Sequence, residues 1–215
     1  MKRKLTLIFK RLYSTFGPQH WWPADSDFEV MVGAILTQNT SWSNVEKAIL
    51  TLKKKKLLNA GKLYRLPPRQ LAGLIKSAGY YNIKAARIKS FLKFFFDRYA
   101  AKTKLMARQE LATLREQLLA VKGIGPETAD SILLYALQKP VFVVDTYTKR
   151  ILSRHGLIKA QADYTLLQGI FMHNLKKDVP LFKEYHALLV KLGKDFCRKQ
   201  NPKCEICPLW SIKNV

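Results

Sequence analysis

The stretch Val121-Lys-Gly-Ile-Gly-Pro-Glu-Thr-Ala129 decides the fold that we expect for this chain. A stripe of leucines at helical spacing runs into it from the N-terminal side, and a second apolar segment, over about 127–138, follows it. Two glycines around one aliphatic residue, placed between two amphipathic segments, are typical of a tight connection between helices. The pattern therefore predicts a helix–hairpin–helix motif over about 114–137.

The residues of this hairpin suit contact with an anion. Gly123 and Gly125 can adopt backbone conformations that are closed to other residues, and Ile124 between them can anchor the turn in the core. Pro126 suits the first position of the helix that follows. The loop then offers N–H groups beside a helix N-terminus, where a DNA phosphate can bind without any base being read. An ordinary helix connection with a glycine C-cap is the alternative interpretation.

The rest of the chain is expected to be all-α. Its 215 residues, 48% of them hydrophobic, are enough for one large domain or two small ones with a substantial core. Capping-box patterns at Ser26 and Ser43 open two helices, and Ala85–Tyr99 carries the apolar stripe of a long one. No segment alternates as a strand would. Further helices are predicted at about 5–16, 67–79, 146–155, 163–175 and 181–198.

Charge gives the first indication of a partner. The chain carries 38 Lys and Arg residues against 15 acidic residues, a formal net charge of +23 at pH 7. Such an excess is typical of a protein that binds nucleic acid, although ribosome-like and membrane-surface proteins share it. No apolar run approaches the roughly 20 residues that span a bilayer, and the segment Leu5–Leu12 is too short and too interrupted by charge for a signal peptide. We therefore expect a cytoplasmic protein associated with the nucleoid.

Further motifs follow one another along the chain: Ile35-Leu-Thr-Gln-Asn-Thr40, Gly79-Tyr-Tyr-Asn-Ile-Lys-Ala85, Val143-Val-Asp-Thr146, Leu192-Gly-Lys-Asp-Phe-Cys197 and Cys204-Glu-Ile-Cys207. Together with the hairpin they resemble the helix–hairpin–helix (HhH-GPD) DNA glycosylase superfamily, and within it the endonuclease III branch. The resemblance spans almost the whole chain. It implies two helical lobes: a six-helix barrel-like bundle, 26–138, that ends in the hairpin, and a second lobe made of 1–25 and 139–215. DNA would lie across the cleft between them.

Asp145 occupies the place where members of this superfamily carry their catalytic aspartate. Breaking an N-glycosidic bond develops positive charge on the sugar, and a fixed carboxylate can stabilise that charge and orient or deprotonate the attacking water. Asp145 also precedes a predicted helix, so its other interpretation is an N-cap. The hairpin upstream of Asp145 favours catalysis.

The resemblance includes one departure. Members that also cut the DNA strand have a lysine directly before Thr-Ala in the second hairpin helix, and its amine forms a Schiff base with the sugar. This chain has Glu127 there, before Thr128. A carboxylate cannot form that imine, so we expect a monofunctional glycosylase with AP lyase activity absent or weak. Glu127 either contacts a cationic lesion or a water in the base pocket, or is an acid in the first helical turn.

Tryptophans predict a pocket for the damaged base. Trp21-Trp22-Pro23, and Trp42 shortly after Asn39-Thr40, resemble the 3-methyladenine glycosylases of the endonuclease III-like type. By that resemblance these four residues line the pocket. An indole can stack on a flipped base, which is worth about 1–3 kcal/mol per base, and can attract a cationic purine. Core packing is the alternative for each tryptophan.

The same resemblance implies a set of DNA contacts. Gln38 would fill the hole that the flipped base leaves, and Tyr80 would wedge between bases. The alternatives are a buried amide bonded to backbone for Gln38 and a surface turn residue for Tyr80. The other implied contacts come from the hairpin: Lys122, Gly123, Ile124, Gly125 and Thr128.

The three cysteines lie together near the C-terminus. A clustered, odd set in a chain expected to be cytoplasmic favours metal binding over disulfides. Cys197, Cys204 and Cys207 have the spacing of the family's iron–sulfur loop, 197–207, but the fourth position of that pattern is Lys213 and no histidine lies in this tail. A [4Fe–4S] cluster normally has four thiolates. The cluster is therefore lost or labile, which we favour, or held by three cysteines and an outside ligand, or replaced by another metal such as zinc.

The leading functional hypothesis is a base-excision-repair glycosylase that removes alkylated purines, such as 3-methyladenine, from duplex DNA by base flipping and Asp145-assisted hydrolysis. An endonuclease III-like glycosylase for oxidised or mismatched bases is the first alternative. A non-catalytic helix–hairpin–helix DNA-binding module is the second. We expect a monomer whose partner is damaged duplex DNA and which does not bind membranes.

Overall fold

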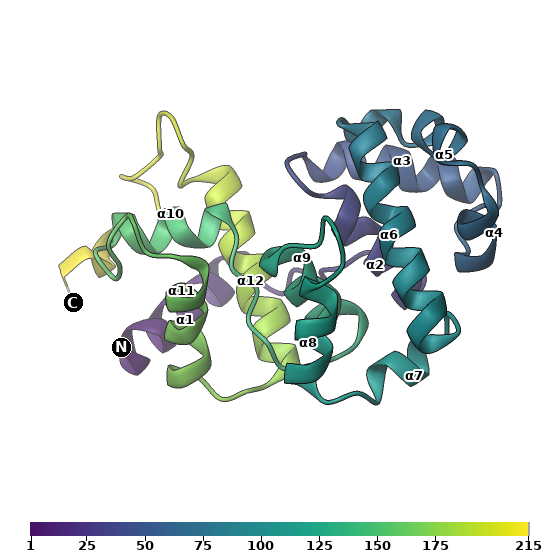
Figure 1. Ribbon diagram of the computed structural model, residues 1–215. Coiled ribbons are helices and arrows are strands. Elements are labelled where there is room, and N and C mark those ends of the chain that lie inside the picture. Colours follow the sequence, from purple (N-terminus) through teal and green to yellow (C-terminus); the bar gives the residue numbers. More distant parts are fainter. Residues whose placement is uncertain (215) are drawn as a thin grey trace. The chain divides into compact units, whose positions relative to one another are not determined.

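The computed structural model describes residues 1–214, and the side chains of residues 1–212. Over this range it is helical without strands, which confirms the predicted all-α class, and no helix is long and apolar enough to cross a membrane. The elements (Figure 1) are α1 (Lys2–Phe16), α2 (Asp27–Leu36), α3 (Trp42–Lys54), α4 (Ala60–Arg65), α5 (Pro68–Leu74), η1 (Lys76–Ala78), α6 (Tyr81–Tyr99), α7 (Thr103–Ala107), α8 (Leu111–Leu119), α9 (Pro126–Ser131), the π-helical turn η2 (Ile132–Ala136), α10 (Thr146–Arg154), α11 (Tyr164–Asn174), α12 (Val179–Asp195) and η3 (Trp210–Asn214).

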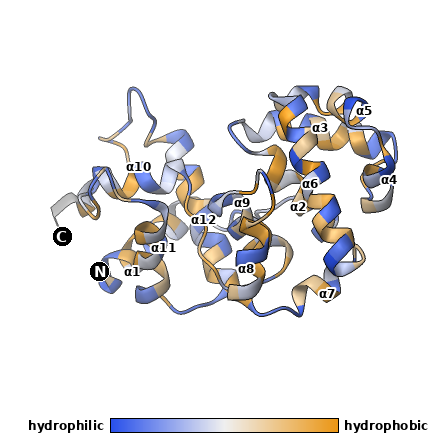
Figure 2. Cartoon of the chain, in the orientation of Figure 1, coloured by the Kyte–Doolittle hydropathy of each residue, from blue (hydrophilic) through white to orange (hydrophobic). Residues whose placement is uncertain are grey.

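The chain forms two compact units. Unit 1 contains Met1–Pro23 and Pro140–Val215, so both ends of the chain contribute to it, and unit 2 contains Ala24–Lys139. Figure 2 shows that many helices carry apolar and polar residues on different faces. Burial of the apolar faces is the main force that holds each unit together.

Helix α2 is the centre of unit 2. All its residues from Glu29 to Leu36 are buried, and they contact α3, α6, α9 and η2. A helix that is apolar on all sides must be enclosed by others, which explains its position. The predicted capping box at its start is confirmed, since Ser26 Oγ accepts the Glu29 N–H at 3.2 Å.

The prediction for the third helix was wrong at its start. Helix α3 begins at Trp42 with Ser41, not Ser43, as its N-cap. Ser41 has extended backbone. Its hydroxyl makes a 3.0 Å hydrogen bond with the hydroxyl of Ser43 and does not cap the helix. The apolar stripe predicted over Ala85–Tyr99 is confirmed, because its members on α6 are buried.

Helix α12 is the centre of unit 1. It packs on α1 and α10, and the Tyr185 hydroxyl donates to the Leu5 carbonyl at 2.9 Å. Gly193 allows α10 to approach, because a Cβ atom at this position would lie 2.4 Å from Tyr147 Cδ1. This close contact fixes the start of α10, and with it Asp145, beside α12.

Candidate functional site

The hairpin of unit 2 has the predicted form. Gly123 has φ +90°, Ile124 is buried, and Pro126 is the first residue of α9. Gly125 has φ −94°, a conformation open to any residue, and a Cβ atom there would meet nothing within 4 Å. Gly123 therefore uses the conformational freedom that the sequence offers, whereas Gly125 does not. The space beside Gly125, at the N-terminus of α9, is open.

A hydrogen-bond network ties the hairpin to the end of α2. The Gln38 amide nitrogen donates to the Gly123 carbonyl and to Thr128 Oγ1, both at 2.9 Å. Arg87 on α6 donates to Gln38 Oε1 at 2.5 Å, and its side chain packs where a Cβ atom on Gly123 would lie. Gln38 thus has the amide–backbone contact that was its alternative interpretation. Its role in filling the DNA stack stays a prediction.

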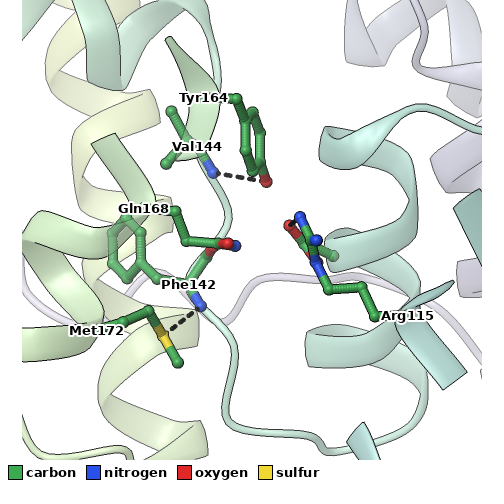
Figure 3. A network of polar contacts seen from close by, with 7 residues as sticks. Arg115, Phe142, Val144, Tyr164, Gln168 and Met172 are labelled. Atoms are coloured by element: carbon green, nitrogen blue, oxygen red, sulfur yellow. Dashed lines mark hydrogen bonds and ion pairs between the residues drawn. The ribbon is translucent and has the colours of Figure 1, made fainter. Parts of the chain in front are cut away.

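An ion pair between a buried aspartate and a half-buried arginine joins the two helices of the hairpin. Asp130 on α9 is fully buried, and Arg115 on α8, labelled in Figure 3, donates to its two oxygens at 2.7 and 3.1 Å. Two parallel bonds of this kind fix the angle between the helices as well as their separation. This pair was not predicted from the sequence, because no local pattern connects the two positions.

The loop before α6 holds Tyr80 away from the core. Tyr80 is 67% exposed and has φ 44°. Lys84, one turn later, is buried and donates to the carbonyls of Leu36 at 2.8 Å and Ala78 at 2.6 Å. Burial, with a smaller contribution from the Arg87 charge, lowers the pKa of Lys84 to about 8. Lys84 therefore anchors the loop from its buried side, while the ring of Tyr80 faces solvent.

Asp145 in unit 1 is the N-cap of α10. Its Oδ1 accepts the N–H and the hydroxyl of Thr148 at 2.7 and 2.8 Å. Its Oδ2 lies 3.6 Å from His186 Nε2 on α12, an ion pair when the imidazole is protonated. Burial alone would raise the pKa of Asp145, but the contacts with His186 and Thr148 outweigh it and hold the pKa below its usual value. His186 was not found from the sequence, because its helix follows much later in the chain.

Helix α11 holds the extended segment that leads to Asp145. The Phe142 N–H donates to Met172 Sδ at 3.3 Å, and the Phe142 carbonyl accepts from Gln168 at 2.7 Å. The Val144 N–H donates to the Tyr164 hydroxyl at 3.3 Å (Figure 3). These three hydrogen bonds fix the backbone just before Asp145 and so restrict its position relative to the rest of unit 1.

The predicted base-pocket residues belong to different units. Trp21 and Trp22 are half-buried in unit 1, with ring centroids 5.1 Å apart and planes tilted by 40°, and Pro23 is exposed. Trp42 is half-buried in unit 2, where Glu127 is exposed in the first turn of α9. The pocket itself stays a prediction.

The three cysteines line one cavity of about 270 Å³ in unit 1. Cys197 is buried, Cys204 and Cys207 are half-buried, and all three are free thiols. Burial raises the pKa of Cys207; a backbone hydrogen bond from Leu209 opposes this, and the other two cysteines add to it. The side chain of Lys213 lies outside the described residues. Within the part of the chain that the structure describes, no three metal-binding side chains are close enough to hold a single ion.

The hairpin, the aspartate that follows it and the cysteine loop occur in the order expected of one family. A family model described as "HhH-GPD superfamily base excision DNA repair protein" matches residues 32–177. The chain belongs to this superfamily. It is therefore a DNA glycosylase of the base excision repair family, which confirms the resemblance seen in the sequence.

Relatives and solved structures agree with this membership. The chain is 50% identical over 204 residues to a protein of Methanocaldococcus jannaschii provisionally named as a DNA repair glycosylase, with 94% of this chain and 92% of that one covered. It is 31% identical to endonuclease III of Thermotoga maritima over 84% of this chain and 79% of that one.

Among solved structures, the chain is similar to 3-methyladenine DNA glycosylase MagIII of H. pylori bound to 1,N6-ethenoadenine, with a TM-score of 0.75, 28% identity and coverage of 88% of this chain and 97% of that one. A trapped endonuclease III–DNA covalent intermediate shares the fold, with a TM-score of 0.84, 21% identity and coverage of 99% and 95%.

Proposed function

We propose that this DNA glycosylase removes alkylated purines from duplex DNA and leaves the strand uncut. Glu127 carries the proposal, because it stands at the second position of α9, directly before Thr128, where strand-cutting relatives need an amine. An imine with the sugar requires an amine nucleophile, and a carboxylate cannot supply one. The expected product is an abasic site in an intact strand.

The alkylated-purine substrate is supported by similarity and by ring chemistry. MagIII, 28% identical over most of this chain, is named for 3-methyladenine and was solved with an etheno-adenine. Trp21 and Trp22 offer electron-rich faces, which attract a cationic purine more strongly than a neutral pyrimidine. The 31% identity to an endonuclease III favours oxidised bases as the second candidate.

Asp145 would act mainly through its charge. A purine alkylated on a ring nitrogen is cationic, so it leaves with the bonding electrons as a neutral base and needs no proton from an acid. Positive charge then develops at C1′ of the sugar, where a fixed carboxylate stabilises it. Water adds to C1′ and its proton passes to the carboxylate or to solvent. The lowered pKa of Asp145 keeps the group anionic at neutral pH and suits this electrostatic role.

The hairpin would position the duplex for this reaction. The N-terminus of α9 has no side-chain cap, a Cβ atom on Gly125 would meet open space, and Lys122 is exposed nearby in the sequence. The N–H groups of such a terminus bind phosphate and carry no base preference. Tyr80, exposed on the loop that Lys84 anchors, would enter the base stack.

The test is base release from duplexes that differ in a single lesion. Three substrates would carry an alkylated purine, an oxidised pyrimidine or a mismatch, and the released base would be identified by chromatography under single-turnover conditions. We expect the alkylated purine to be released at least about tenfold faster than the others, which corresponds to about 1.4 kcal/mol. Faster release of the oxidised pyrimidine would overturn the substrate assignment. Binding without any release would favour the non-catalytic module.

A further inference from the structure

The cavity beside the cysteine loop contains a metal-binding side chain from another part of unit 1. Besides Cys197, Cys204 and Cys207, its lining includes His155 and Arg154. His155 is the C-cap residue of α10, and its Nδ1 atom is shielded from solvent. No pattern in the sequence connects His155 with the cysteines, because the tail itself contains no histidine. The fold brings three thiols and an imidazole to one cavity.

Hydrogen bonds fix α10 against the cysteine loop. Arg150 donates to the carbonyls of Cys197 at 2.7 Å and Gly193 at 3.0 Å. Arg154 donates to the carbonyls of Arg198 at 2.6 Å and Lys199 at 3.0 Å, and lies 3.4 Å from Cys197 Sγ. His155, next in sequence to Arg154, is thereby held at the cavity independently of any bound group.

We propose that this cavity holds a [4Fe–4S] cluster through Cys197, Cys204 and Cys207, and that His155 supplies the fourth ligand in place of the family's fourth cysteine. On binding, the three thiols lose their protons and bind as thiolates, while the histidine binds through a neutral imidazole nitrogen. Imidazole is an established ligand of iron–sulfur centres: in Rieske [2Fe–2S] centres two histidines replace two cysteines on one iron. Lys213 then needs no ligand role.

The size of the cavity and the arrangement of its donors favour a cluster over a single ion. About 270 Å³ greatly exceeds the roughly 10–15 Å³ that one water molecule, similar in size to a small ion, requires. Three donors within reach of one zinc ion are not found among the described residues. A cubane carries its irons at separate corners, so its ligands stand farther apart than those around one ion. Thiolates bind zinc and iron–sulfur clusters alike, so the size of the cavity and the spacing of its donors carry the distinction.

The experiment compares iron retention in the full-length protein and its variants. Wild type, His155→Ala and His155→Cys would be purified without oxygen and reconstituted with iron and sulfide under a thiol reductant. His173→Ala is the matched control, because His173 is an exposed histidine of unit 1 on α11 that does not line the cavity. Iron, acid-labile sulfide and the rate of cluster loss to a chelator would be measured. Circular dichroism would check that each variant is folded.

We expect wild type and His173→Ala to hold iron and sulfide in equal amounts, and His155→Ala to lose its cluster about tenfold faster or more. His155→Cys should restore retention, because it recreates a four-thiolate set. Equal retention in wild type and folded His155→Ala would overturn the proposal, as would zinc without iron in wild type. A His155→Cys variant that holds no more iron than His155→Ala would also count against it.

A spectroscopic measurement identifies the ligand directly. The protein would be labelled with ¹⁵N-histidine, and the cluster brought to a paramagnetic state by one-electron oxidation or reduction. Pulsed EPR of wild type should show a strong nitrogen coupling that is absent from His155→Cys and present in His173→Ala. No such coupling in wild type, or a coupling that persists in His155→Cys, would exclude His155 as the ligand. Neither result depends on glycosylase activity, so this proposal and the proposed function fail separately.

Discussion

Asp145 uses its two oxygens for different purposes. Oδ1 accepts both hydrogen bonds from Thr148 and closes the first turn of α10, while Oδ2 faces His186. The N-cap and the catalytic interpretation of this residue are therefore compatible. Both could be predicted from the sequence, because a cap is local and the family motif marks the position. The contact with His186 could not, since it depends on how α10 and α12 pack.

Asp145→Asn separates the two purposes. Asparagine is as good an N-cap as aspartate, so the thermal stability at neutral pH should fall only by the contribution of the charge contact with His186. The amide carries no charge, so single-turnover base excision should fall by about 10²–10³-fold. Asp163→Asn is the matched control, because Asp163 caps α11 in the same way and should tolerate the change without loss of excision. Full excision by Asp145→Asn would remove the catalytic assignment.

His186→Asn should raise the pKa of Asp145, because burial then meets less opposition. In wild type the carboxylate stabilises the fold above the ordinary aspartate pKa of 3.8, and this contribution is lost as the pH falls through the lower folded-state pKa. The variant should therefore unfold at a higher pH on acidification, and the acid limb of its excision rate should move upward. His173→Asn should leave both unchanged. An unmoved acid limb in His186→Asn would contradict the role given to this contact.

At the scale of elements, the hairpin shows which features a sequence discloses. The positive φ of Gly123 and the position of Pro126 follow from local rules, and both are confirmed. Of the two glycines that could adopt a positive φ, only Gly123 does, because the chain has already turned there before it reaches Gly125. The Arg115–Asp130 pair was not predicted, since its residues lie on separate helices.

Arg115→Ala should destabilise the protein by about 3 kcal/mol, because it leaves Asp130 charged and buried without its bidentate partner. For a chain of this size, that corresponds to a fall in melting temperature of about 6–12 °C. Lys93→Ala, which breaks the exposed pair with Asp97 on α6, is the control and should not shift the melting temperature measurably. Equal effects of the two variants in thermal unfolding would contradict this assignment.

The two hairpin glycines should respond differently to alanine. Gly123→Ala places a Cβ atom 2.3 Å from Arg87 Cγ at φ +90°, and should cost about 1–3 kcal/mol of stability. Gly125→Ala meets no atom within 4 Å, so its stability should be unchanged. Its methyl group would nevertheless cover the N-terminus of α9 and weaken duplex binding. Thermal unfolding and equilibrium binding distinguish the two effects, and unchanged binding by Gly125→Ala would refute a phosphate contact there.

For the whole molecule, the all-α class and the superfamily could be predicted because motifs along almost the full length each carry local information. A net charge of +23 agrees with a DNA substrate. Contacts between segments that lie far apart in the sequence could not be predicted from it. The cavity of unit 1 is the clearest case, because α10 adds His155 to cysteines that follow it much later in the chain.

The central claim is that this glycosylase removes a base without cutting the strand. The direct measurement uses a duplex with one alkylated purine in an end-labelled strand, incubated with wild-type enzyme and divided into portions with and without hot alkali. A further portion receives borohydride, which traps an imine between enzyme and sugar. If the enzyme is monofunctional, strand breaks should appear only after alkali and no adduct should be trapped, because Glu127 supplies no amine. Breaks without alkali, or a borohydride-trapped adduct, would contradict it.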